Sequence, residues 1–156
     1  MFAYVGCRTT RERNARGRGI SVYRITPDGG WHLVQLLEGL TNPSYLALNR
    51  DRTRLYCVHG DGGEASAFAV DAQSGQLGLI NTRPCGGRNP VHLVLDHSER
   101  FLLVANFATG TLGAIELTGD GALGLLADVA TVPGAPGPYR GQQKGAHPHH
   151  IPYDPS

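Results

Sequence analysis

The chain has 156 residues, about the length of one domain, and a formal net charge of +1, which gives no electrostatic support for binding nucleic acid or an anionic membrane. Hydrophobic residues make up 40% and charged residues 17%, and no apolar stretch is long enough to cross a bilayer. Residues 1–8 lack a basic segment followed by an apolar one, so no signal peptide is visible and a cytoplasmic protein is expected.

The cysteines and the small residues narrow the class of fold. Cys7, Cys57 and Cys85 are odd in number, scattered and without CxxC spacing, which argues against a disulfide framework or a structural zinc site. Cys57 lies in an apolar run and is predicted to be a small core residue. The 22 glycines and 10 prolines favour many short strands joined by tight turns.

One eight-residue pattern occurs three times. Residues 42–49 recur as residues 89–96 and again as residues 147–154, at separations of 47 (89 − 42) and 58 (147 − 89). Each copy opens on a polar residue followed by proline, namely Asn42, Asn89 and His147. A residue before proline is biased toward extended backbone, so all three positions are predicted to be extended.

Three further elements repeat between these copies. They are residues 1–6, 54–59 and 100–105; residues 19–25, 65–70 and 112–117; and residues 28–34, 74–79 and 120–125. Each element is short and rich in β-branched or aromatic residues, and turn residues such as Asp-Gly separate them. Four strands in each unit of roughly 45 residues are typical of a β-propeller blade. A β-sandwich also has many short strands, but it does not require the same four elements three times over.

The sequence therefore predicts an all-β fold, a β-propeller of four-stranded antiparallel blades with about three blades' worth present. The expected repeats are residues 1–41, 42–88 and 89–146, with the first strand of a further blade at 147–156. In this register the chain begins on the second strand of a blade. Propellers typically close with four to eight blades, so we expect either self-association or a C-terminal half that completes the ring.

The densest group of chemically active side chains lies in residues 137–156. Strand residues alternate between faces, so His147 and His149 are expected on one side and His150 on the other. His92 holds the same repeat position as Tyr45 and His150, and it either faces the channel or is a packed strand histidine. A solvated turn is the plain alternative for the histidine loop, and His-x-His is a weak metal pattern with no acidic or cysteine partner at ligand spacing.

A second polar stretch lies between the first two predicted strands. It carries five arginines in a glycine-flanked loop: Arg8, Arg11, Arg13, Arg16 and Arg18. The interpretation we favour is a solvated loop, and the alternative is a contact with a substrate phosphate.

Four segments resemble a known family. Residues 4–9, 19–23, 40–48 and 101–110 are similar to the lactonase family of seven-bladed β-propellers, which includes propeller-type 6-phosphogluconolactonases and carboxymuconate lactonising enzymes. The similarity runs along essentially the whole chain, with the motifs in the same order. It covers about the first half of a family member.

The resemblance also implies site residues. The closing loop is similar to the family's signature of a glutamine, a short link and Pro-His-Ala-His-Ser, which places Gln143 on the glutamine and His147 and His149 on the two histidines. His150 replaces the serine. Gln142 stands where the family often has an arginine, and the nearest arginine is Arg140.

The resemblance implies hydrolysis of a small-molecule lactone, most simply of the 6-phosphogluconolactonase type. His147 or His149 would serve as general base, with Arg140, Gln143 and His92 as substrate contacts. The alternatives are a carboxymuconate-type lactonising enzyme, a propeller that only binds partners, and an inactive truncated fragment. The sequence contains no nucleotide-binding loop, nucleophile elbow or cofactor fingerprint, so no cofactor and no metal are expected.

Overall fold

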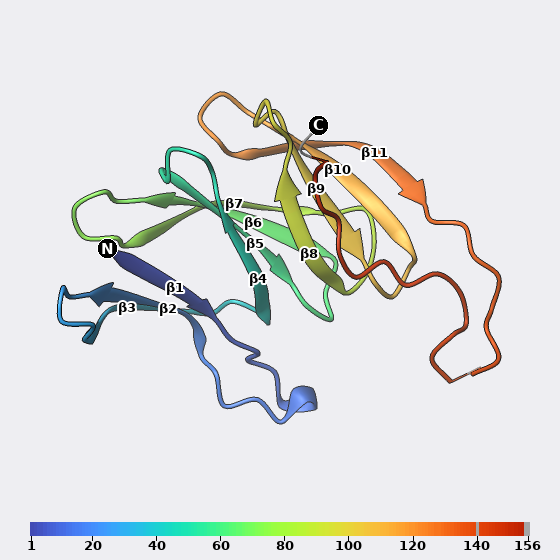
Figure 1. Cartoon of the computed structure of the whole chain (residues 1–156), viewed down its shortest axis with the longest axis horizontal. Helices are drawn as coiled ribbons and strands as arrows, with labels where there is room; N and C mark the ends of the chain where they lie inside the picture. The colour runs from blue at the N-terminus through green and yellow to red at the C-terminus, as the bar shows by residue number, and fades with distance from the viewer. Residues whose placement is uncertain (140, 155–156) are drawn as a thin grey trace.

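The structure is a computed structural model that describes residues 1–139 and 141–154. In these residues eleven strands form three antiparallel sheets (Figure 1). Sheet 1 contains β1 (Phe2–Gly6), β2 (Gly19–Ile25) and β3 (Trp31–Glu38). Sheet 2 contains β4 (Pro43–Leu48), β5 (Arg54–His59), β6 (Glu64–Val70) and β7 (Leu77–Pro84). Sheet 3 contains β8 (Pro90–Leu95), β9 (Phe101–Asn106), β10 (Thr111–Leu117) and β11 (Leu123–Thr131), and a short 3-10 turn spans Arg11–Arg13.

Each sheet is a simple meander whose strands lie in chain order. The three sheets stand side by side, with sheet 2 in the middle, so that β4 lies against both β1 and β8 and β7 lies against β11 (Figure 1). This is the arrangement of successive propeller blades. The predicted fold, a partial β-propeller of antiparallel blades, is confirmed.

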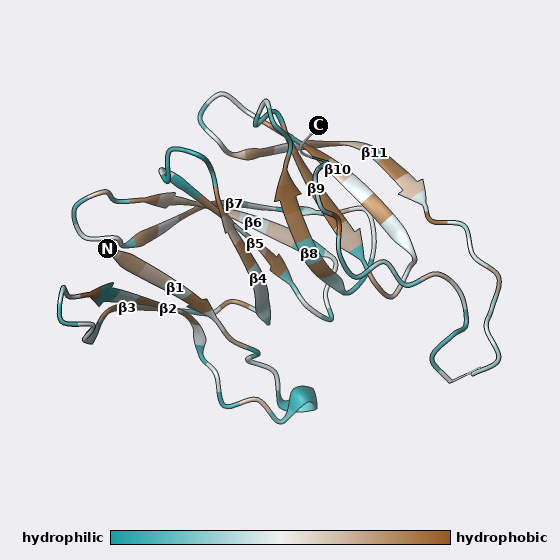
Figure 2. Ribbon diagram, in the orientation of Figure 1, coloured by the Kyte–Doolittle hydropathy of each residue, from teal (hydrophilic) through white to brown (hydrophobic). Residues whose placement is uncertain are grey.

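The core lies between the sheets, and β5 shows how the sequence builds it. Successive side chains of a strand point to opposite faces. Leu55 and Cys57 therefore pack toward sheet 1, whereas Tyr56 and Val58 pack toward sheet 3. All four are buried, because β5 is covered on both faces, and the strand reads as a continuous apolar run (Figure 2). The prediction that Cys57 is a core residue is confirmed.

Strand pairing gives sheets 2 and 3 one uniform offset. Pro43 pairs with His59 and Pro90 pairs with Asn106, a separation of 47 in both cases (90 − 43 and 106 − 59). The copy of β5 in sheet 3 is therefore β9, residues 101–106, rather than the expected residues 100–105. Arg54 opens one copy and Arg100 precedes the other, which suggested the wrong match. A slip of one residue would turn every side chain to the opposite face of the strand.

Residues 147–154, expected as the described part of a first strand, form no strand in the structure. The segment passes along β8 (Figure 1). A strand requires a hydrogen-bonded neighbour, and no described strand pairs with this segment. Pro148 and Pro152 also lack the N–H that a ladder needs.

Within residues 1–139 and 141–154, no helix has the length and apolar character needed to cross a membrane.

Gly113 on β10 tests the close packing of sheet 3. A Cβ at this position would lie 2.1 Å from the Cys85 carbonyl oxygen, whereas a Cβ at Gly78 on β7 meets nothing within 4 Å. Gly113→Ala is expected to lower the free energy of unfolding by about 1–3 kcal/mol through overpacking. Gly78→Ala should change it by less than about 1 kcal/mol. Chemical denaturation of both variants measures the difference, and equal stabilities would contradict the packing.

Candidate functional site

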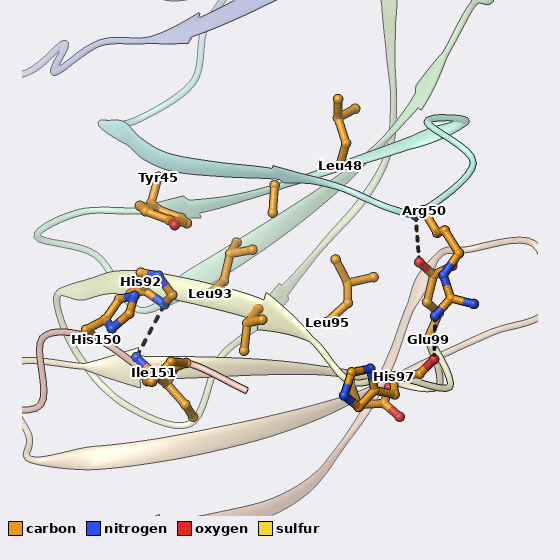
Figure 3. Close-up of a pocket in the computed structure, with 14 residues that line it drawn as sticks. Tyr45, Leu48, Arg50, His92, Leu93, Leu95, His97, Glu99, His150 and Ile151 are labelled. Carbon is orange, nitrogen blue, oxygen red and sulfur yellow. Dashed lines mark hydrogen bonds between the residues drawn. The ribbon is translucent and has the colours of Figure 1, made fainter. Parts of the chain in front are cut away.

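A cleft of about 480 Å³ lies between β4, β8 and residues 150–152. Its wall is apolar and includes Leu93 and Leu95 of β8. One end holds Tyr45, His92 and His150, and the opposite end holds a second polar group (Figure 3). That second group consists of Arg50, His97 and Glu99. The cleft therefore has the form of an apolar floor between two polar ends.

Three rings form a column at the first end of the cleft. The Tyr45 and His92 ring centroids are 4.3 Å apart, and those of His92 and His150 are 4.1 Å apart in an edge-to-face arrangement. The three residues hold one repeat position, at separations of 47 (92 − 45) and 58 (150 − 92). Because β4, β8 and the 147–154 segment present the same repeat position to one cleft, residues that are equivalent in the sequence contact one another in space.

The surroundings of His92 favour its neutral form. Its side chain is only 6% exposed, and its Nδ1 accepts a hydrogen bond from the Ile151 N–H at 3.4 Å. Burial lowers the pKa of His92, and the neighbouring His150 and His149 lower it further. In the neutral ring the remaining proton is on Nε2, because Nδ1 acts as acceptor. His92 therefore offers an N–H donor on Nε2.

His147 is oriented by a different contact. Its Nδ1 lies 2.7 Å from the Phe107 carbonyl oxygen, and its ring stacks on Phe107 at 4.5 Å. A carbonyl oxygen only accepts, so Nδ1 carries the proton and the neutral ring has a lone pair on Nε2. His149 meets the edge of the same Phe107 ring at 5.8 Å. His147 and His149 thus contact Phe107, whereas His150 contacts His92.

The position before each proline ties one sheet to the loop of the sheet before it. Asn42 Oδ1 accepts from the Thr9 N–H at 2.8 Å, and Asn89 Oδ1 accepts from the Asp61 N–H at 2.9 Å. His147 makes the corresponding contact with Phe107. The predicted extended backbone is wrong at Asn42 and Asn89, whose φ angles are 42° and 51°. Asparagine tolerates this left-handed conformation better than most residues.

The other predicted contact residues have different positions. Gln143 uses its side chain inside its own loop, where Oε1 accepts from the Tyr139 N–H at 3.1 Å. Its backbone N–H donates to the Tyr139 carbonyl oxygen at 2.8 Å, so Gln143 contacts Tyr139 through both its side chain and its backbone. Arg140 lies outside the described residues. Lys144 lines a separate hollow of about 340 Å³ together with His147.

Three arginines of the basic loop are paired, Arg18 with Glu38 and the other two with Asp61. Arg8 donates to Asp61 at 2.5 Å, and Arg13 donates through Nε to the same carboxylate at 2.8 Å. The hydrogen bond from Arg13 is the main cause that lowers the pKa of Asp61, with further contributions from Arg8. This pairing offsets part of the positive charge of the loop.

His59 and His150 had not been chosen as candidates from the sequence. Both nitrogens of His59 are occupied, Nδ1 by the Thr41 carbonyl oxygen and Nε2 by Ser66, each at 2.7 Å, so it is a structural residue. His150 belongs to the ring column, and its shared repeat position with His92 was the signal that could have identified it. In the described part of the chain, no three His, Cys, Asp or Glu side chains are grouped as a metal site.

Comparison with known proteins identifies the family. The family described as "Lactonase, 7-bladed beta-propeller" matches residues 2–156, so the chain belongs to this family. A 6-phosphogluconolactonase from Formosa agariphila is 34% identical over 138 residues, which cover 85% of this chain and 39% of that protein.

Two solved structures are similar as well. A Bacteroides fragilis protein matches with a TM-score of 0.83 and 28% identity, covering 94% of this chain and 40% of that one. A periplasmic gluconolactonase from Pseudomonas aeruginosa matches with a TM-score of 0.77 and 27% identity, covering 86% and 40%. The chain spans about two fifths of the length of the proteins it matches.

The lowered pKa of His92 predicts a pH-dependent stability. The unfolded chain takes up a proton near pH 6.5, the ordinary histidine value, while the folded chain resists protonation of His92 until a lower pH. The contribution of His92 to the free energy of unfolding is therefore fully present above pH 6.5 and is lost as the pH falls toward the folded-state pKa. Denaturation midpoints measured across this range should decrease as the pH is lowered. His92→Gln should make the midpoint less dependent on pH. The exposed His32 provides the control: a profile that flattens equally in His32→Gln would contradict the assignment.

Proposed function

We propose that the protein opens lactone rings by hydrolysis, as a 6-phosphogluconolactonase-type enzyme acting on a small phosphorylated sugar lactone. Membership of the lactonase family supports this function, as does similarity to a protein named 6-phosphogluconolactonase. The observation that carries the proposal is the contact of His92 with His150 at one end of the cleft, on the segment that also carries His147 and His149. A carboxymuconate-type lactonising activity is the second use of the same family fold, but no described contact favours it.

The proposed chemistry requires a base and an oxyanion donor. Water attacks the lactone carbonyl carbon, the ring C–O bond breaks, and the products are a carboxylate, a free hydroxyl group and a proton. His147 is suited to take the proton of the attacking water, because its Nδ1–H contact leaves Nε2 with a lone pair. His149, which shares the Phe107 ring, is the alternative base.

Substrate binding completes the proposal. The Nε2–H of His92 is available to donate to the carbonyl oxygen as negative charge develops there. A phosphate requires a cation, and Lys144 lines the same separate hollow as His147. Arg140 and Gln143 remain proposed contacts that rest on the resemblance to the family signature.

The cytoplasmic location expected from the sequence remains a prediction. One similar protein is named as periplasmic, so cell fractionation of the expressed protein is the direct test. Recovery from the periplasm would contradict the prediction.

Hydrolysis of 6-phosphoglucono-δ-lactone, followed as proton release, tests the function. The unmodified chain should exceed the spontaneous rate, and His147→Gln should lower kcat by roughly 10²–10⁴-fold if it is the general base. His92→Gln should lower kcat by roughly 10²–10³-fold through loss of the oxyanion donor. His32→Gln, an exposed position on β3, is the matched control and should retain full activity. Activity that survives His147→Ala combined with His149→Ala would contradict the assigned base.

A further inference from the structure

Two guanidinium groups of the basic loop share one carboxylate. Arg13 donates to one oxygen of Asp61 through Nε at 2.8 Å and to the other oxygen through Nη2, so Arg13 alone engages both oxygens. Arg8 adds a further bond to Asp61 from its Nη1 at 2.5 Å. Because arginine stays charged over the accessible pH range, two positive charges meet one negative charge and one positive charge remains.

The backbone of this loop is held in place without the Arg8 side chain. The N–H groups of Thr9 and Thr10 donate to Asn42 Oδ1 at 2.8 and 3.2 Å. Within the described residues, Asp61 is the one hydrogen-bond acceptor of the Arg8 side chain, which is 37% exposed. A guanidinium group has five N–H donors, so Arg8 keeps donors that can bind a ligand.

The Arg8 guanidinium lies close to the start of β4, the strand that carries Tyr45. A Cβ added at Gly60 would lie 2.9 Å from Arg8 Nη1 and 3.0 Å from Ser44 Oγ, so these two atoms are at most 5.9 Å apart (2.9 + 3.0). Ser44 is the residue next to Tyr45, whose ring contacts His92 in the column at one end of the cleft. The surplus positive charge is therefore near that end of the cleft.

A β-bulge brings Ser44 and Tyr45 to neighbouring positions on the surface. The pairing of β4 with β5 shifts between Pro43 and Tyr45, so Ser44 is the extra residue of the bulge. A bulge disrupts the regular alternation of side chains, and Ser44 and Tyr45 are both exposed. The pairing of β8 with β9 shifts at the equivalent place, just before His92. Bulges of this kind commonly redirect side chains beside active sites.

Arg8 holds the same place in sheet 1 that Phe107 holds in sheet 3. Tyr4 and Tyr56 are equivalent, because each hydroxyl group donates to a glycine carbonyl oxygen of the next sheet at 3.0 Å. Their separation of 52 (56 − 4) matches Arg8 with Gly60 (8 + 52). The separation of 47 between sheets 2 and 3 then matches Gly60 with Phe107 (60 + 47).

The contacts of Phe107 show which end of the sheets this place faces. Phe107 contacts His147 and His149, the two candidate bases. Ser44 and His149 are each the third residue of the pattern that opens a repeat. The approach of Arg8 to Ser44 therefore corresponds to the contact of Phe107 with His149. Arg8 is thus at the same end of the sheets as the candidate bases.

We propose that Arg8 binds the phosphate group of the substrate, an inference that rests on the proposed hydrolysis of a phosphorylated lactone. Arginine binds phosphate through paired N–H donors, and Asp61 orients the guanidinium group. Tyr45 adjoins His92 directly and Arg8 through Ser44. A substrate lying over the Tyr45 ring can therefore place its carbonyl oxygen at His92 and its phosphate at Arg8.

The preference for a phosphorylated substrate is the first test. We compare kcat/KM for 6-phosphoglucono-δ-lactone with kcat/KM for glucono-δ-lactone, because these substrates differ only in the phosphate. Arg8→Gln should lower this ratio roughly 10- to 100-fold, and Arg8→Lys should restore part of it. Arg18→Gln is the matched control, since Arg18 belongs to the same loop but pairs one-to-one with Glu38, and it should leave the ratio unchanged. A structural role of Arg8 alone would lower both rates and not the ratio.

Calorimetric titration with 6-phosphogluconate and with gluconate tests the phosphate contact without catalysis. The unmodified chain should bind 6-phosphogluconate more tightly, and Arg8→Gln should weaken that binding roughly 10- to 100-fold while Arg18→Gln does not. This result would support the contact even if neither lactone were hydrolysed, in which case the proposed function alone fails. Equal affinities in Arg8→Gln and Arg18→Gln, a loss found only in Lys144→Gln, or no binding of 6-phosphogluconate would overturn the inference.

Discussion

The arrangement of the sheets depends on a polar contact made at the start of each repeat. Asn42 and Asn89 accept hydrogen bonds from the loop of the preceding sheet, and His147 donates to the corresponding loop. Hydrophobic burial holds the sheets face to face but is non-directional. The directed hydrogen bonds fix which loop each repeat meets, and this determines how the cleft-lining residues are aligned.

The column of rings at one end of the cleft between β4, β8 and residues 150–152 follows from that alignment. Since successive sheets present equivalent positions to the same side, Tyr45, His92 and His150 form one column of rings. Burial within this column lowers the pKa of His92, and the contact with Phe107 assigns the proton of His147 to Nδ1. The scaffold thus provides both a nitrogen donor and a nitrogen base, which supports the proposed hydrolysis of a lactone.

Much of the fold was predictable because strand patterns repeat at nearly constant spacing, and even the shared position of His92 and His150 was visible in the sequence. The match of residues 54–59 was off by one, since adjacent arginines resemble each other while pairing follows the buried face. The use of Gln143 within its own loop and the pairing of Arg8 with Asp61 could not be predicted. Both depend on loop conformations that no periodic pattern encodes.

The tautomer of His147 tests most directly whether a single residue both ties the sheets together and provides a base. Long-range ¹H–¹⁵N correlation spectra at neutral pH distinguish a protonated Nδ1 from a protonated Nε2. The contact with the Phe107 carbonyl oxygen predicts the Nδ1–H form, with the lone pair on Nε2. An Nε2–H form would contradict both the tie between the sheets and the assignment of His147 as the base.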